Sequence, residues 1–320
     1  MKLLTFERSG DMKLGCLVGD DVLDLNRAFE KHLGNSFADI ETDFCLDMLS
    51  LLDLGKTGLG EAKKTSREAE ALKKEGAARD LYKEGVLLKG EDVKIVAPIP
   101  RPRKNIMCLG LNYTEHIQEG RRARGEPPAP PPPAPIFFTK ATTSVIGPSD
   151  EIVYPRATTS LDYEGELAFI IGKKGKYITQ DKAYEYIVGY SVFNDVTARD
   201  LQRKHSQWFR GKSLDTFAPM GPYLITSDEI ADPMNLELEL WVNGESRQKA
   251  NTGDMIFKIP EIVEVLSSGM TLEQGDIVAT GTPSGVGSAR GPGGLLKAGD
   301  LVETWIEGIG KLRNKVVAEQ

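Results

Sequence analysis

A pair of acidic residues at the start of an apolar stretch is the pattern in this sequence with the clearest chemical meaning. Glu164 and Glu166 stand two residues apart where the apolar run 167–171 begins. In a β-strand, residues i and i+2 point to the same side, so the two carboxylates would lie side by side and repel each other. A divalent cation or a basic partner relieves such repulsion at the mouth of a buried strand. The alternative is that both side chains are exposed at a strand end, and the spacing alone leaves this choice open.

A third acid completes a set of metal ligands if the first interpretation holds. Asp195 ends another apolar run, 190–194, and its carboxylate would add a third oxygen to those of Glu164 and Glu166. Hard oxygen ligands without histidine or thiolate select Mg²⁺ or Mn²⁺, with Ca²⁺ as a further choice, rather than zinc.

Histidine is scarce in this chain, with three in 320 residues, and His116 has an acidic residue at helical spacing. If residues 112–120 form a helical turn, His116 and Glu119 at i and i+3 can hydrogen-bond. A carboxylate that holds an imidazole and stabilises its charged form makes a competent general base for water. A histidine and a glutamate three apart are more often an ordinary helix-surface pair, so this signal is weak by itself.

Polar residues after Asp195 could bind an anionic substrate. Arg199 and Gln202 would share one face of a helix, and Lys212 follows within the same short stretch. A fixed cation and an amide donor beside a metal suit a substrate carboxylate or a developing enolate. The alternative is that these are ordinary solvated helix charges, which is our interpretation of Arg203 and Lys204.

The elements that must position these residues change in character along the chain. Residues 1–97 read as a small N-terminal α+β domain with a structural role or a role in assembly. It would contain short strands at 2–6, 13–18 and 22–25 and helices at 26–33, 41–54 and 59–81.

Residues 98–320 read as a larger domain in which strands recur with few long helices between them. Helical patterns are clearest at 182–184 and 260–268, and no GxGxxG motif follows a strand, so a mixed, mainly antiparallel sheet is favoured over a dinucleotide-binding fold. The expected strands lie at 105–109, 135–138, 166–171, 187–194, 222–225, 236–242, 276–280 and 301–306.

Composition restricts the partners and the compartment. The net charge of −7 comes from interspersed acids and bases, so neither a nucleic-acid footprint nor a membrane-binding patch is indicated. No segment approaches the roughly 20 apolar residues of a membrane span, and charges at 7, 8 and 11 interrupt any signal peptide, so we expect a cytoplasmic protein. Cys16, Cys45 and Cys108 are far apart and fit reduced buried thiols.

Residues 127–135 are nearly all proline and must be extended. They could be a surface linker, a docking segment for a partner, or a stiff arm behind a mobile loop at 115–125. Their position between the two most chemical-looking segments favours the arm.

Taken in order, these segments resemble the fumarylacetoacetate hydrolase family, and the match runs from about residue 98 to 316. The motifs are NYxxHxxE at 112–119, FTK at 138–140, DYExE at 162–166, GYxxxNDxTARDxQ at 189–202, GKSxDTFxPxGP at 211–222 and GTPxGVG at 281–287. The resemblance implies a mixed β roll or barrel-like sandwich, preceded by a variable small N-terminal domain, in a protein that is usually a homodimer.

The resemblance also implies a role for each site residue. Glu164, Glu166 and Asp195 correspond to the metal carboxylates, and His116 with Glu119 corresponds to the dyad that activates water. The remaining implied residues are Lys212, which stabilises a developing carbanion, Arg199, Gln202 and Thr282, which contact substrate oxygens, and Lys140, a further pocket residue.

The activity implied is metal-dependent hydrolysis of a C–C bond in a small anionic acylpyruvate-like 1,3-dicarbonyl acid. The alternatives are a 2-oxo acid decarboxylase, a dehydratase or an isomerase on the same metal scaffold, and a non-catalytic binding protein. The basic segment 121–125 departs from the usual lid, which a substrate with an extra carboxylate would explain and solvated surface charge would explain equally well.

Overall fold

The first part of the chain folds as an antiparallel meander in the computed structural model, which describes residues 1–31, 33, 46–291 and 293–320. Its first hairpin closes at Ser9 and Gly10, whose φ angles of 55° and 87° suit a tight turn. The strands predicted at 2–6, 13–18 and 22–25 are confirmed with small shifts. The meander consists of β1 (Lys2–Arg8), β2 (Asp11–Val18), β3 (Asp21–Asp24), β4 (Leu87–Lys89) and β5 (Lys94–Val96).

Four helices cover this meander: α1 (Leu25–Glu30), α2 (Met48–Asp53), α3 (Gly55–Lys74) and α4 (Arg79–Lys83). The single helix predicted at 59–81 is wrong, because Gly76 with φ 73° ends α3 and the chain restarts as α4. The amide of Ala77 donates to the carbonyl of Leu72 at 2.8 Å, which is the hydrogen bond of a glycine-terminated helix end. Parts of the helices predicted at 26–33 and 41–54, together with His32 and Cys45, lie outside the described residues.

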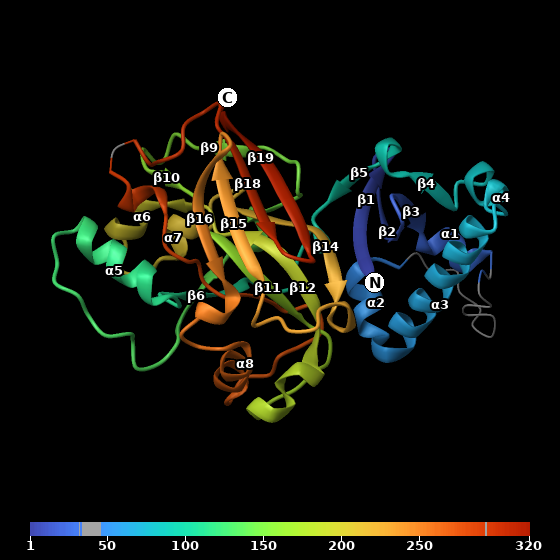
Figure 1. Ribbon diagram of the computed structural model, residues 1–320, viewed down its shortest axis with the longest axis horizontal. Helices are drawn as coiled ribbons and strands as arrows, with labels where there is room; N and C mark the ends of the chain where they lie inside the picture. The colour runs from blue at the N-terminus through green and yellow to red at the C-terminus, as the bar shows by residue number, and fades with distance from the viewer. Residues whose placement is uncertain (32, 34–45, 292) are drawn as a thin grey trace.

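One large sheet runs through both parts of the chain (Figure 1). Strand β1 pairs antiparallel with β14 (Ala218–Thr226), with Lys2 opposite Ile225. The order continues from β14 through β12 (Ile187–Asn194), β11 (Gly165–Ile171), β17 (Ile277–Ala279) and β6 (Ile106–Gly110) to β7 (Ile136–Lys140). The units predicted at 1–97 and 98–320 therefore share a sheet, and their independence as domains stays a prediction.

A second, smaller sheet packs against the middle of the large one. It has the order β16 (Glu245–Asn251), β15 (Glu237–Val242), β18 (Leu301–Ile306), β19 (Gly310–Ala318) and β9 (Ile152–Tyr154). Most pairings in both sheets are antiparallel, and the layers form an open sandwich rather than a closed barrel. The predicted α+β class with a mixed, mainly antiparallel sheet is confirmed. In this sheet the strand predictions missed β16 and β19, whose sequences are largely polar, and the three-residue β9.

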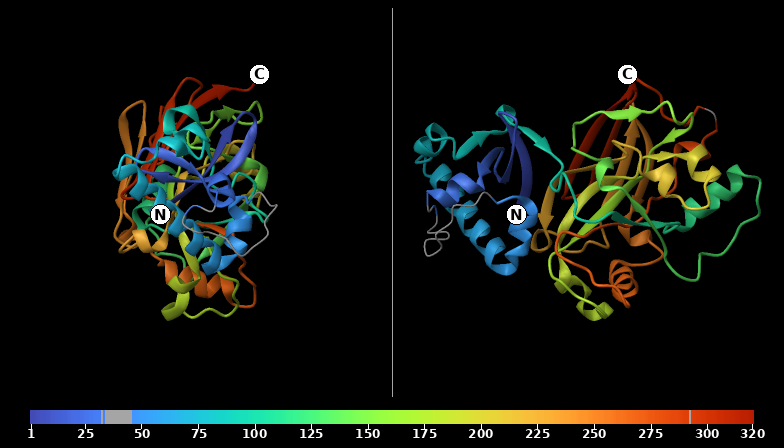
Figure 2. Two further views of the ribbon diagram at one scale, coloured as in Figure 1. Left: turned by 90° about the vertical axis from the view of Figure 1, so that its right-hand side faces the viewer. Right: turned by 180° about the vertical axis from the view of Figure 1, so that it is seen from behind.

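Short strands and helices complete the part of the chain after residue 97 and bring its polar residues together. The short strands are β8 (Val145–Ile146), β10 (Leu161–Asp162) and β13 (Thr197–Ala198), and the helices are α5 (Thr114–Ala123), α6 (Arg199–Lys204), α7 (Phe209–Lys212) and α8 (Ile259–Ser267). Helix α5 and the proline segment after it lie at the end of the molecule opposite the N-terminal meander (Figure 2). Among the helices that the structure describes, none combines the length and the apolar character needed to cross a membrane.

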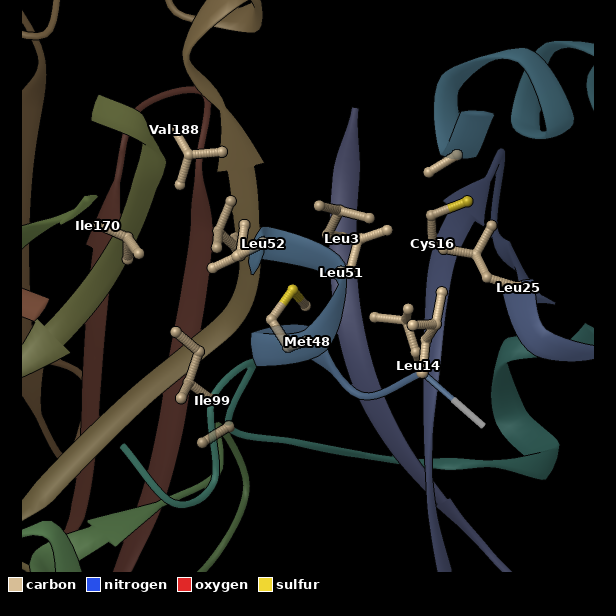
Figure 3. Packing of buried hydrophobic residues seen from close by; sticks show 14 of the residues in the cluster. Leu3, Leu14, Cys16, Leu25, Met48, Leu51, Leu52, Ile99, Ile170 and Val188 are labelled. Carbon is tan, nitrogen blue, oxygen red and sulfur yellow. The ribbon is translucent and has the colours of Figure 1, made fainter. Parts of the chain in front are cut away.

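The joint between the meander and the catalytic sheet is apolar. Figure 3 shows Met48, Leu51 and Leu52 of α2 between Leu3 of β1 and Val188 of β12, within one continuous buried cluster. Two of the cysteines, Cys16 and Cys108, are buried free thiols in the same cluster, as the sequence predicts for them.

Candidate metal centre and active site

Three carboxylates meet where β11 begins and β12 ends. The two strands are antiparallel neighbours with Gly165 opposite Asn194, so Glu164 and Glu166 lie beside Asp195. One carboxylate oxygen from each of the three lies within 4.8 Å of the others, and all three side chains are buried. The period-two spacing of the glutamates and the position of Asp195 at a strand end thus produce the predicted cluster of hard oxygen ligands.

Two cations contact this cluster directly. Lys212 at the end of α7 places Nζ at 2.6 Å from both Glu164 Oε2 and Asp195 Oδ2. Arg199, the first residue of α6, donates to Glu164 Oε1 at 2.6 Å and to Asp162 Oδ2 at 2.7 Å. These bonds fix the positions of the ligand carboxylates, because charge-assisted hydrogen bonds are short and strong.

The charge balance leaves one carboxylate poorly compensated. Burial alone would raise the pKa of Glu164, but the Arg199 and Lys212 cations hold that pKa well below its usual value. Burial and the neighbouring charges of Asp195 and Glu164 raise the pKa of Glu166 well above its usual value. A divalent cation at the three carboxylates would relieve this like-charge repulsion, so the residues present fit Mg²⁺ or Mn²⁺.

Lys140 lies behind the cluster rather than in front of it. Its side chain is fully buried at the end of β7, and Nζ donates to Asp195 Oδ1 at 2.5 Å and to the carbonyl of Val196 at 3.0 Å. Burial lowers the pKa of Lys140 despite the adjacent Asp195 carboxylate. Lys140, which the resemblance places in the pocket, therefore contacts Asp195 of the carboxylate cluster and is not among the residues that line the cavity.

The predicted His116–Glu119 pair lies on α5, one helical turn apart. Nδ1 of His116 is 3.0 Å from Glu119 Oε1, and since a carboxylate only accepts, Nδ1 carries the hydrogen and Nε2 is left unprotonated in the neutral ring. The other oxygen, Oε2, accepts from the backbone amide of Gly285 at 2.8 Å, and the amide of Val286 lies 3.4 Å from Oε1 as a second, longer donor to that oxygen. Helix α5 is thus held over the carboxylate cluster like a closed lid.

An asparagine anchors the base of this lid. The Asn112 side chain is buried, donates to the carbonyls of Phe257 and Thr280 at 3.1 and 2.8 Å, and accepts from the amide of Phe257 at 2.7 Å. Asn112 belongs to the NYxxHxxE motif at 112–119, but the sequence indicated no role for it. Its polar type just after the apolar strand β6 was the available signal.

Asp162 is a second functional residue that sequence reasoning left without a role. It accepts from Arg199 Nε and from the amides of Gly287 at 2.7 Å and Ser288 at 3.0 Å. It therefore ties the arginine to the loop that follows β17. Its spacing of two from Glu164 was the signal that could have indicated a shared face.

A cavity of about 520 Å³ lies between the lid and the carboxylate cluster, of which Glu164 and Glu166 line it and Asp195 does not. Apart from Glu164 and Glu166, its charged and ionisable lining groups are basic, which suits an anionic molecule. Of the predicted site residues, the lining includes His116, Glu164, Glu166, Arg199, Gln202, Lys212 and Thr282, and it adds Arg121, Arg124, Arg203 and His205.

The proline segment is hydrogen-bonded to the lid helix. Gln118 of α5 donates to the carbonyl of Ala129 at 2.8 Å, and Arg121 donates to the carbonyl of Pro127. Arg124 pairs with Glu126 just before the prolines at 2.8 Å. The lid helix and the start of the proline segment therefore contact each other, and the role of the segment as a stiff arm stays a prediction.

Comparisons with known proteins agree with this geometry. Residues 105–317 match the family model for the C-terminal part of fumarylacetoacetate (FAA) hydrolase. Oxaloacetate tautomerase YisK of Bacillus subtilis (strain 168) is 49% identical over 227 residues, which cover 70% of this chain and 73% of that protein. A fumarylacetoacetate hydrolase from psychrophilic Exiguobacterium antarcticum superimposes over 100% of both chains with a TM-score of 0.74 and 37% identity. Maleylpyruvate hydrolase from Sphingobium sp. SYK-6, in complex with manganese(II) and pyruvate, does so over 100% of both chains with a TM-score of 0.70 and 29% identity.

Proposed function

This chain belongs to the fumarylacetoacetate hydrolase family, and from that premise we propose that it is a divalent-metal enzyme that interconverts the enol and keto forms of a small 2-oxo dicarboxylic acid such as oxaloacetate. The observation that carries the proposal is a proton-transfer pair, His116 and Glu119, facing three buried carboxylates across a cavity lined by cations. The relative named as an oxaloacetate tautomerase supports the choice of substrate.

The polar groups of the cavity divide the work of such a reaction. Glu164, Glu166 and Asp195 would hold the cation, which when bound supplies Lewis acidity that acidifies the C–H bond beside the 2-oxo group. His116 takes a proton from that carbon through Nε2 and gives one to the enolate oxygen, so the net change is the transfer of one proton from carbon to oxygen. Glu119 stabilises the imidazolium that forms in between.

Binding and orientation fall to the α6–α7 region. Arg199 Nη1 donates to Gln202 Oε1 at 3.1 Å, which leaves the amide NH₂ of Gln202 as a donor for a substrate oxygen. Lys212 contributes a fixed positive charge for the enolate, because its ammonium is already held between two carboxylates. The closed lid excludes water from the proton-transfer site.

The test is exchange of the C3 hydrogens of oxaloacetate with D₂O, followed by NMR, together with the decay of enol absorbance. Metal-stripped protein should be inactive and should recover with Mn²⁺ or Mg²⁺. His116→Ala and Glu164→Ala should stay inactive, while Gln180→Met, at an exposed residue bonded to Glu264, serves as a control with wild-type activity. Wild-type protein that binds metal but leaves the exchange rate unchanged would exclude the proposal.

Hydrolysis of an acylpyruvate is a second candidate, which the Glu119 contacts favour. A histidine held by an anchored carboxylate can equally take a proton from water, which then attacks the acyl carbonyl, and the C–C bond breaks to give an acid and the enol of pyruvate. The manganese-bound neighbour is named a maleylpyruvate hydrolase. Incubating an acylpyruvate in ¹⁸O-labelled water distinguishes the two candidates. Hydrolysis releases an acid that carries the label, whereas tautomerisation releases no acid. Pyruvate formed from oxaloacetate itself would instead indicate decarboxylation.

A further inference from the structure

Gln248 is a buried polar residue behind the active site that the mechanism above does not use. It lies on β16, in the smaller sheet, directly after an irregularity in the pairing of β16 with β15. Gln248 is 1% exposed, although its neighbours on the strand are half-buried (Arg247) and exposed (Lys249). A buried amide is costly unless its hydrogen bonds are made, so its partners show what it is for.

The amide of Gln248 joins two segments of the active site. Its Oε1 accepts from the backbone amide of Gly165 at 2.9 Å, between the ligands Glu164 and Glu166. Its Nε2 donates to Thr282 Oγ1 at 2.8 Å and to the carbonyl of Pro283 at 2.9 Å. The orientation of the amide is fixed, because an N–H of Gly165 can only donate and the carbonyl of Pro283 can only accept.

These bonds determine what the Thr282 hydroxyl can offer to a substrate. Thr282 Oγ1 is 3.0 Å from the carbonyl of Gly165, which only accepts, so the single hydroxyl hydrogen of Thr282 is used there. Gln248 occupies one lone pair of the oxygen, and within residues 1–31, 33, 46–291 and 293–320 no other hydrogen bond to it is seen. Since Thr282 lines the cavity, it can present only an acceptor, which suits the O–H of an enol better than a carboxylate oxygen.

The same strand supports the turn on which the lid closes. Gly285 has φ 106°, and a Cβ atom there would lie 2.0 Å from the carbonyl oxygen of Arg247, so the turn rests directly on β16. The amide of Gly285 in turn donates to Glu119 of the lid. A displacement of the turn would therefore reach the His116–Glu119 pair through this bond.

We propose that Gln248 is a positioning residue that orients the Thr282 hydroxyl as an acceptor toward an enol substrate and holds the 282–286 turn in place for lid closure. The enol-recognition part rests on the proposed function, whereas the lid part depends only on the contacts of Gln248, Gly285 and Glu119.

The experiment compares Gln248→Met, which keeps the length of the side chain but no polar atoms, with Gln248→Glu. The glutamate retains an acceptor for Gly165 and, when ionised, offers no donor to Thr282 or Pro283. If Gln248→Met does not fold, Gln248→Glu alone tests the proposal. Gln180→Met is the matched control, since Gln180 makes its hydrogen bond at the surface.

Lid closure is measured by tryptic cleavage after the arginines at 121, 122 and 124, with Mn²⁺ and oxalate present as a chelating stand-in for the substrate. We expect oxalate to protect wild type and Gln180→Met, and both Gln248 variants to be cleaved roughly tenfold faster, as for the loss of one or two buried hydrogen bonds. Wild-type protection in both Gln248 variants would overturn the inference.

Enol turnover tests the Thr282 part. For Gln248→Met we expect the KM for enol oxaloacetate to rise roughly tenfold with a smaller change in kcat. Because the effect of Gln248 on enol binding is exerted through Thr282, the rise in KM of the Gln248→Met/Thr282→Val double variant should be clearly smaller than the product of the two single effects. Fully additive losses would overturn this part. Wild-type protein without turnover would refute the proposed function, and a difference in lid protection would still support the positioning role.

Discussion

Replacing Glu119 with glutamine exchanges one oxygen for an NH₂ group and leaves the size of the side chain unchanged. In the structure, Oε2 of Glu119 accepts from Gly285, and Oε1 accepts from Nδ1 of His116 at 3.0 Å. An amide has only one acceptor oxygen. The Gly285 amide, at 2.8 Å from Oε2, is a closer donor than the Val286 amide, at 3.4 Å from Oε1, so the oxygen should stay with Gly285 and the new NH₂ group would face His116. The ring must then accept at Nδ1, and its hydrogen moves to Nε2, the atom that has to take the proton.

The expected loss follows from this change of tautomer. A protonated Nε2 cannot act as the base, and general-base catalysis by a positioned side chain is worth about 10² to 10⁴ in rate. Glu119→Gln should therefore lower kcat by about that factor, or about 3 to 5 kcal/mol in the barrier. The affinity for Mn²⁺ should be unchanged, because Glu119 is not among the three clustered carboxylates.

The assay is C3 hydrogen exchange of oxaloacetate in D₂O with Mn²⁺-loaded protein, and the Mn²⁺ Kd is measured on the same preparation. Glu115→Gln is the control, because Glu115 lies on the same helix with a side chain that is 73% exposed. If Glu119→Gln exchanged at the wild-type rate with unchanged Mn²⁺ affinity, the assignment of the proton-transfer role to His116 and Glu119 would be refuted.

Three further perturbations test the metal centre and the fold. Glu166→Gln removes one of the three clustered carboxylates and should weaken Mn²⁺ binding at least about tenfold, measured by titration calorimetry. Leu52→Ala opens a cavity in the joint of the meander and should cost about 2 to 5 kcal/mol in urea unfolding, whereas Leu54→Ala, at a residue 37% exposed, should cost less than about 1 kcal/mol. Partial burial works against ionisation of Asp228, yet its hydrogen bond from Lys63 at 2.7 Å helps to lower its pKa from 3.8 to about 2. A carboxylate with a depressed pKa stabilises the fold at pH values above its unfolded pKa, and this stabilisation is lost as the pH falls through the folded pKa. The difference in Tm between wild type and Asp228→Asn should therefore shrink between about pH 4 and pH 2. For this exposed pair the contribution at higher pH should be at most about 1 kcal/mol.

Strand periodicity predicted that Glu164 and Glu166 share a face, and the family resemblance resolved the choice that the spacing left open between a metal cluster and exposed side chains. Glu164 and Glu166 are two apart before an apolar run, and Asp195 ends another, so only the pairing of β11 with β12 was needed to join them. The His116–Glu119 bond likewise follows from helical spacing. These features are local, and local geometry is what a sequence pattern determines most directly.

Residues whose roles depend on distant pairing were harder to predict. Strand β16 reads ESRQKAN, which has little strand character, although Asn243 and Gly244 before it are a strong hairpin signal that was not used. Gln248 was missed with that strand. The family resemblance assigned Lys140 to the pocket, and nothing in the neighbouring sequence indicates that its ammonium turns inward to Asp195. The pairing of β1 with β14 joins segments too far apart for any periodicity to indicate it.

That pairing also sets a time order for synthesis. A ribosome delivers β1 more than two hundred residues before β14, which corresponds to about 10 to 40 s at ordinary elongation rates. During that interval Lys2 and Leu3 of β1 lack the strand with which they pair, and the face of α2 that packs against β12 in the finished protein stays uncovered. The nascent chain therefore exposes apolar surface until β12 and β14 have been synthesised, and slow translation before β14 would lengthen that exposure.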